Sequence, residues 1–266
     1  MNNRYFCAKE NGKLNYPHTI LTGFGFLASS IAWAIYDPYI TKILNRLLTS
    51  SATITSWSTK LNEAFPKLAE FAAANGEDVA TAAGGITLVP LFIGIIMTFD
   101  NIFGVIFQPT FGKLSDNTHS RFGKRRPYVI FGAPISAVLF AIIPLVAVKS
   151  GSLPLTMLFI ILFVFIMSLW RAPVVALMPD LTPSEIRSEG NAVINLMGGL
   201  GSAIGLFAGT IVTAIYCAVT GANSKADDFD EYVTFPYVFL LGAIVMIIGM
   251  LVILFFVKEP DSRLKI

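Results

Sequence analysis

Three charged side chains interrupt long apolar stretches of the sequence: Asp37, Asp100 and Arg171. A charge in the middle of a membrane helix costs at least about 2.5–3.5 kcal/mol, so each should face a cavity or a partner. A carboxyl in such a place can take up and release a proton, because burial favours its neutral form. Arg171 keeps its charge and needs an acidic partner, for which the two aspartates are the candidates. This pattern indicates either ligand and proton binding within a membrane or a structural ion pair.

Aromatic and amide side chains accompany these charges. Trp33 lies one helical turn before Asp37, and Tyr36 is adjacent to the same face. An aromatic plane beside a carboxylate suits a sugar, which offers an apolar ring face and hydroxyl donors. The alternative is an interfacial tryptophan with an aspartate near the outer end of a helix.

A second polar stripe follows from helical spacing. Asp100, Gly104 and Gln108 are four residues apart, and Asn101 lies beside them. We expect this stripe to line a cavity rather than to serve packing. Asn195, in a later apolar stretch, is expected either to face the same cavity or to hydrogen-bond across helices.

The composition places these residues in a membrane protein. Of 266 residues, 55% are hydrophobic and 14% are charged, whereas soluble domains contain about 25% charged residues. A spanning helix needs about 20 mainly apolar residues, and backbone polar groups in lipid must be satisfied within the helix. We therefore predict an all-α membrane protein. Its six spanning helices are expected at residues 20–45, 86–111, 127–148, 154–179, 190–218 and 235–257.

Lysine and arginine predict the orientation. Twelve of them fall on one side and six on the other if both termini are cytoplasmic, as the positive-inside rule favours. The prediction is a multi-pass protein of the plasma membrane, with a cytoplasmic segment at 1–17 and a six-helix bundle at 18–258. A charged cytoplasmic turn occupies 112–127, and a long outer loop occupies 48–84.

The outer loop has an amphipathic pattern. Its apolar residues recur every three or four positions, with charged residues between them, as on one face of a helix. These apolar residues are Ile54, Trp57, Leu61, Phe65, Leu68 and Ala72. The loop is expected to lie on the membrane surface or to cap the bundle, with a lid over a ligand as the alternative.

The charged turn reads "GKLSDNTHSRFGKRRP" and contains five basic residues. A role in keeping this loop on the cytoplasmic side would explain the basic residues, but not the glycine and aspartate among them. The glycine allows a close helix approach, and the aspartate can accept from helix N-termini and pair with arginines. We therefore favour a latch at an inner gate. The latch residues are Gly112, Asp116, Arg121, Gly123, Lys124, Arg125 and Arg126.

Two blocks resemble a known family. "QPTFGKLSDNTHSRFGKRRP" is similar to the turn between helices 2 and 3 of the major facilitator superfamily, above all of sucrose transporters and glycoside–pentoside–hexuronide cation symporters. The block from Arg171 to Gly205 resembles their passage from helix 4 to helix 5, and "WAIYDPYITKIL" more weakly resembles the first helix. The family has two six-helix halves. The resemblance implies an N-terminal half whose tail, 259–266, leads to a missing C-terminal half.

The resemblance implies a secondary transporter for a sugar or glycoside. Sodium-coupled members carry aspartates where this chain has Gly104, Gln108 and Arg171, so we expect proton symport through Asp37 or Asp100 rather than sodium coupling. The expected partners are the lipid bilayer, the sugar, the proton and the complementary half. The alternative is a truncated or repurposed membrane protein that binds a partner bundle without transporting.

Other chemistry is not indicated. The sequence contains no H-E-x-x-H, G-x-S-x-G or Walker A pattern, and its two cysteines lie far apart. We expect no catalytic residues, no metal site and no cofactor. The net charge of +2 comes from the loops that are predicted to be cytoplasmic, so nucleic acid is not an expected partner.

Overall fold

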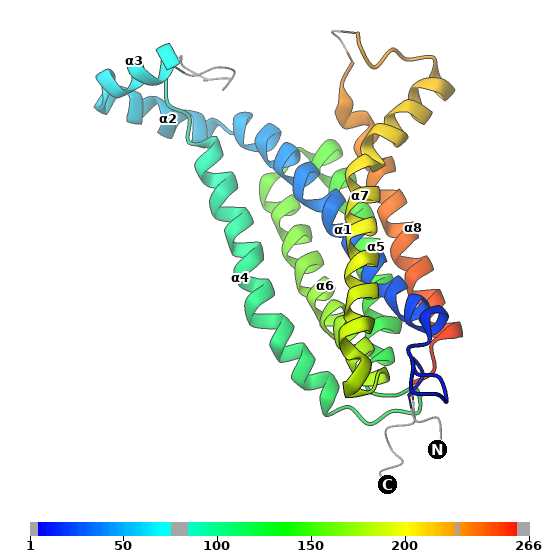
Figure 1. The fold of residues 1–266 in the computed structure, drawn as a ribbon. Helices are drawn as coiled ribbons and strands as arrows, with labels where there is room; N and C mark the ends of the chain where they lie inside the picture. The colour runs from blue at the N-terminus through cyan, green and yellow to red at the C-terminus, as the bar shows by residue number, and fades with distance from the viewer. Residues whose placement is uncertain (1–4, 76–84, 227–228, 260–266) are drawn as a thin grey trace.

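The computed structural model describes residues 5–75, 85–226 and 229–259, which are mostly helical and contain no β-strand. This confirms the predicted all-α class. In chain order the elements are α1 (Tyr16–Thr49), α2 (Ala52–Ala64), α3 (Pro66–Asn75), α4 (Val89–Asp116), α5 (Arg126–Ser150), α6 (Leu153–Leu181), the 3₁₀ turn η1 (Ser184–Ile186), α7 (Arg187–Thr220), the 3₁₀ turn η2 (Glu231–Thr234) and α8 (Phe235–Phe256) (Figure 1).

Six of these helices are long and apolar enough to cross a membrane: α1, α4, α5, α6, α7 and α8. Their number and order confirm the prediction. α1 and α7 extend beyond the predicted ranges at both ends and α4 at its C-terminal end, because helical hydrogen bonding continues past the apolar middle that hydropathy detects. α1, for example, is 34 residues long, about 50 Å at 1.5 Å per residue, and therefore reaches beyond a hydrocarbon core of about 30 Å.

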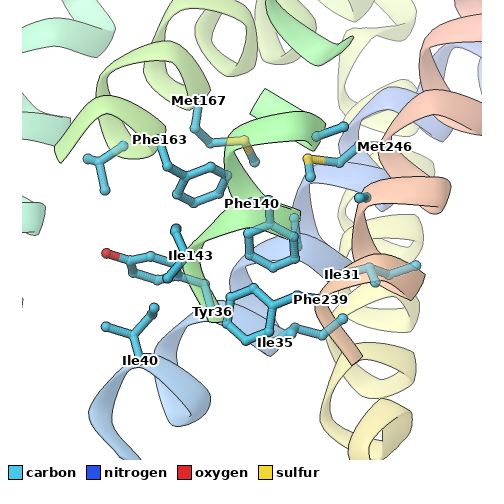
Figure 2. Packing of buried hydrophobic residues seen from close by; sticks show 14 of the residues in the cluster. Ile31, Ile35, Tyr36, Ile40, Phe140, Ile143, Phe163, Met167, Phe239 and Met246 are labelled. Atoms are coloured by element: carbon cyan, nitrogen blue, oxygen red, sulfur yellow. The ribbon is translucent and has the colours of Figure 1, made fainter. Parts of the chain in front are cut away.

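The core lies where α1, α5, α6 and α8 meet. Phe140 of α5 packs at its centre, with ring centroids 4.5 Å from Phe239 of α8 and 5.0 Å from Phe163 of α6. Tyr36 of α1 is fully buried against Phe163 at 5.3 Å (Figure 2). This aromatic cluster fixes α1 and α6, the two helices that carry most of the charged groups predicted to lie in the membrane.

Small residues bring α7 close to α1. A Cβ atom at Gly201 would lie 2.6 Å from the Leu27 carbonyl oxygen, and one at Gly205 would lie 2.8 Å from that of Ile31. No side chain fits there without moving backbone. The repeated glycines therefore serve helix packing, as small-residue seams do in membrane proteins.

α4 stands apart from the other helices along much of its length (Figure 1). Only four of its residues are buried, among them Asp100 and Phe111. Its lower end packs on α6, where Phe111 meets Phe165 edge to face at 5.4 Å. The separation leaves an open space between α4 and the helices α1 and α6.

The outer loop forms two helices, not the single amphipathic helix that its spacing suggested. The break falls at Phe65–Pro66, because proline lacks an N–H and restricts the residue before it. α2 is tied to the chain just before α4: the Ile86 N–H donates to Asn62 at 2.8 Å, and the Leu88 N–H donates to Ser58 at 3.1 Å. Residues 76–84 lie outside the described part of the chain.

The first and last described residues lie at the same end of the bundle as the α4–α5 turn (Figure 1). The Cys7 N–H donates to the Leu181 carbonyl at the end of α6. Glu259, after α8, accepts from the backbone of the α4–α5 turn. We call this the turn end of the bundle. The helices α2 and α3 lie at the opposite end (Figure 1).

Candidate functional site

A cavity of about 640 Å³ opens between α1, α4 and α6. It has the mixed character of a small-molecule site, with apolar walls and a few convergent polar groups. Its lining residues are Trp33, Asp37, Met97, Asp100, Asn101, Gly104, Val105, Gln108, Pro109 and Arg171.

The cavity brings together six of the eight residues predicted for binding or coupling. Tyr36 lies behind its wall, fully buried. Asn195 on α7 is exposed and does not line this cavity. The reason is that none of the residues that line the cavity comes from α7, which packs on α1 through Gly201 and Gly205.

Helical spacing accounts for the arrangement. Trp33 and Asp37 are one turn apart on α1, while Asp100, Gly104 and Gln108 form a stripe on α4. The missing side chain at Gly104 matters, because a Cβ atom there would lie 3.3 Å from the Gln108 amide nitrogen. The glycine thus keeps the middle of the stripe open between two polar groups.

Asp100 is the buried carboxyl of the site, with 7% of its surface exposed. The Tyr36 hydroxyl donates to its Oδ2 at 2.5 Å. The Tyr36 ring also meets the Trp33 ring edge to face, with centroids 5.1 Å apart. A continuous chain of contacts therefore runs from the cavity wall at Trp33 to the carboxyl of Asp100.

Arg171 makes no direct ion pair with any described residue, contrary to the expectation that Asp37 or Asp100 would be its partner. The ion pairs among the described residues lie elsewhere. Asp37 attracts the guanidinium without closing a salt bridge. Asp100 is instead held by a hydroxyl on α1. The guanidinium lies 5.7 Å from the Trp33 ring centre, a cation–π distance.

Two donor atoms of the cavity-lining residues are buried and have no acceptor among the described residues. They are the Nε–H of Arg171 and the indole N–H of Trp33. A buried donor without an acceptor is costly, by about 1–3 kcal/mol. Both donors belong to cavity-lining residues, but the two nitrogen atoms are themselves shielded from the cavity, so a ligand can accept from them only if the side chains turn.

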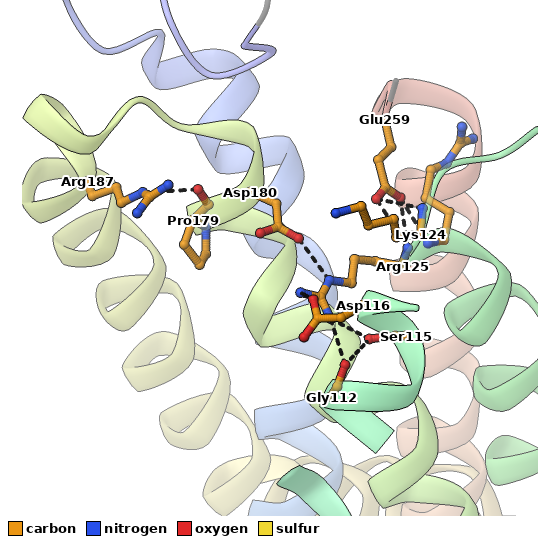
Figure 3. Close-up of polar contacts among 10 residues, drawn as sticks. Gly112, Ser115, Asp116, Lys124, Arg125, Pro179, Asp180, Arg187 and Glu259 are labelled. Carbon is orange, nitrogen blue, oxygen red and sulfur yellow. Dashed lines mark hydrogen bonds and ion pairs between the residues drawn. The ribbon is translucent and has the colours of Figure 1, made fainter. Parts of the chain in front are cut away.

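At the turn end, Arg125 joins three helix ends (Figure 3). Its side chain is 5% exposed. It donates to Asp116 of α4 at 2.5 Å and to Asp180 of α6 at 2.9 Å, and further to Ser115 and to the Gly112 carbonyl. The predicted pairing of Asp116 with an arginine is present, and it lies entirely within this half.

Glu259 binds the start of α5 from the chain that follows α8 (Figure 3). It accepts from the backbone N–H groups of Lys124 at 2.8 Å, Arg125 at 3.0 Å and Arg126 at 3.2 Å. A carboxylate at a helix N-terminus is favourable, although burial raises the pKa of Glu259 above its ordinary value. Gly123, at φ 94°, lets the carboxylate approach, because a Cβ atom there would lie 2.3 Å from it.

Sequence reasoning missed Asp180 and Glu259. Asp180 stands in the P-D-L turn and Glu259 in "VKEP", but nothing local connects either residue to the charged turn. The predicted latch residues also differ in role: Lys124 contributes its backbone, Arg126 donates to the Leu254 carbonyl, and Arg121 is exposed. The physical link is visible only once the helix ends meet.

The chain matches the profile of the Major Facilitator Superfamily over residues 19–266. It is 27% identical over 195 residues to the "Sucrose transport protein SUC3" of Arabidopsis thaliana, which covers 63% of this chain and 31% of that protein. It is 29% identical over 153 residues to the "Membrane-associated transporter protein" of Homo sapiens, covering 50% and 28%. The matched segments therefore span less than a third of either relative.

Proposed function

The chain belongs to the Major Facilitator Superfamily, and we propose that it is the N-terminal half of a secondary transporter that moves a sugar or glycoside with protons. The observation that carries the proposal is the cavity between α1, α4 and α6, which gathers an aromatic plane, two carboxyls and an arginine in membrane-spanning helices. Such charges within a bilayer mark substrate and ion pathways. The similarity to a sucrose transport protein supports a sugar as the cargo.

The chemistry of the wall suits a polyhydroxylated ligand. The Trp33 ring offers a flat apolar surface, and Asp37 beside it can accept from hydroxyl groups. The Arg171 guanidinium, which also lines the cavity, can donate to ring or glycosidic oxygens. The volume of about 640 Å³ lies within the usual range for small-molecule sites, about 300–1,000 Å³.

A proton is the favoured coupling ion. The α4 stripe presents Gly104 and Gln108 where sodium-coupled members of the resembling group carry aspartates. Sodium prefers oxygen ligands, several at a time, whereas a single carboxyl suffices for a proton.

Transport requires the complementary half. In this family one bundle rocks against the other around a site at their interface, and here the cavity walls come from one bundle alone. The proposed arrangement places both termini and the charged turn in the cytoplasm, as the distribution of lysine and arginine favours. The competing function is a non-transporting membrane protein that docks on a partner bundle. A neighbouring reading frame that encodes six further helices would favour the transporter.

Ligand protection of a cavity cysteine tests the proposal. The chain would carry Asn101→Cys in a background with Cys7→Ser and Cys217→Ser, together with its complementary half in membranes. Sucrose, maltose and methyl glucosides are then tested as protectants against alkylation. At least one should slow alkylation at position 101 but not at the control position, His119→Cys in the charged turn, and Arg171→Ala should remove the protection. Equal rates with and without every sugar would contradict a sugar site in this cavity.

A further inference from the structure

We infer that Asp100, and not Asp37, carries the coupled proton, and that Tyr36 links this proton to the ligand platform at Trp33. The inference rests on the proposed function, because it assigns the proton of that transport cycle to one carboxyl. It is carried by the different surroundings of the two aspartates and by the aromatic contacts that lead from Asp100 to the cavity wall.

The two carboxyls differ in how far the protein covers them and in their neighbours. Asp37 is exposed, and the Arg171 charge attracts it. Asp100 is 7% exposed, and the neutral hydroxyl of Tyr36 donates a hydrogen bond to it. A charge out of water is costly unless it is paired. Asp100 therefore gains more from taking up a proton than Asp37, whose charge attracts an arginine.

The charged groups that face Asp100 come from two helices. α1 contributes Tyr36 and Asp37, and α6 contributes Arg171 on the far side of the cavity. The Asp37 charge repels a charge on Asp100, while the Arg171 charge makes no salt bridge with it. Uptake of one proton by Asp100 leaves Asp37 and Arg171 as a balanced pair of opposite charges in the cavity.

Tyr36 contacts both Asp100 and the Trp33 ring. Its hydroxyl donates to Asp100 Oδ2 at 2.5 Å, so it stabilises the ionised carboxyl. Its ring is fixed between Trp33, at 5.1 Å, and Phe163, at 5.3 Å. Because the phenol is fully buried and packs on the Trp33 ring, a change in its position acts on a side chain that lines the cavity.

The proton step is simple. A proton from water in the cavity forms an O–H bond on the Asp100 carboxylate, and the same bond breaks when the proton leaves. Protonation removes the charge to which Tyr36 donates, so the hydrogen bond weakens and holds the phenol ring, and with it the Trp33 ring, less firmly. A ligand seated on Trp33 acts on the same contacts. Ligand and proton binding are thereby linked, and the linkage is reciprocal.

Infrared spectroscopy of the chain in nanodiscs tests the proton site without any ligand. Titration with pH should reveal a carboxylic-acid C=O band that Asp100→Asn removes and Asp37→Asn retains. Tyr36→Phe, which keeps the ring and its packing, should move the midpoint of this band to higher pH, because the ionised carboxyl loses a donor. Loss of the band in Asp37→Asn, or an unchanged midpoint in Tyr36→Phe, would overturn the assignment.

Tryptophan emission tests the link to the ligand platform. The pH titration of the emission should contain a transition with the midpoint of the infrared band. This transition should be absent from Asp100→Asn and Trp33→Phe and should move with the band in Tyr36→Phe. A transition that persists in Trp33→Phe would refute the link. Since neither assay uses a sugar, a failure of sugar uptake would reject the proposed cargo, whereas the spectra decide the assignment of Asp100 on their own.

Discussion

Replacement of Arg125 by alanine should destabilise the bundle more than any other single change in the charged turn. The side chain is 5% exposed and holds Asp116, Asp180 and Ser115 together. Removing one partner of a buried ion pair costs about 3–5 kcal/mol. The two carboxylates are 55% and 38% exposed, so solvent compensates them in part. We therefore expect a loss of about 2–4 kcal/mol.

The assay is reversible unfolding in mixed detergent micelles, followed by circular dichroism. Arg121→Ala is the matched control, because Arg121 is an exposed arginine of the same turn, and it should change the free energy of unfolding by at most about 0.5 kcal/mol. Arg125→Lys keeps the charge but not the planar fork, so its loss should be intermediate. Equal stability of Arg125→Ala and Arg121→Ala would refute the reasoning that the buried guanidinium joins the three helix ends.

Three further predictions concern other contacts. Glu259→Gln should reduce the pH dependence of the free energy of unfolding, because burial raises the pKa of Glu259. The stability that this carboxyl contributes is present below its ordinary pKa of 4.5 and is lost as the pH rises through the raised pKa, which unfolding measured against pH would show. Gly201→Ala should lower the melting temperature, because its Cβ would press on backbone, whereas Gly199→Ala, with no atom within 4 Å, should not; equal melting temperatures would contradict the packing seam. Arg171→Ala should abolish sugar protection, and its effect on stability should be milder when combined with Asp37→Asn; strict additivity in that double-mutant cycle would show that the two charges do not interact.

The features that depend on spacing within one helix could be predicted from the sequence. The six spans follow from apolar length, and the stripe of Asp100 and Gln108 follows from spacing by four, so both could be predicted. The same rule placed Trp33 and Asp37 on one face. What could not be predicted depends on contacts distant in sequence. Helical spacing along one segment carries no information about which helix end meets another.

Arg171 and Glu259 illustrate this limit from opposite directions. The charge of Arg171 in an apolar stretch predicted an acidic partner, but the structure leaves its Nε–H without an acceptor in the cavity. The charge of Arg171 alone does not indicate whether its partner is an acidic side chain of the protein or a ligand. Nothing in the sequence distinguishes Glu259 from other residues after the last span, yet it caps α5, which begins more than 130 residues earlier in the chain. The break between α2 and α3, in contrast, could have been predicted from Pro66.

Uphill sugar uptake tests proton-coupled sugar transport most directly. This chain and its complementary half would be reconstituted in proteoliposomes with an inward proton gradient, and the accumulation of radiolabelled sucrose, maltose and methyl glucosides would be measured. We predict that at least one sugar accumulates above its external concentration, that a protonophore abolishes the accumulation, and that the chain without its complementary half shows none. No accumulation of any sugar under the gradient, or equal accumulation after the gradient is dissipated, would contradict proton-coupled sugar transport.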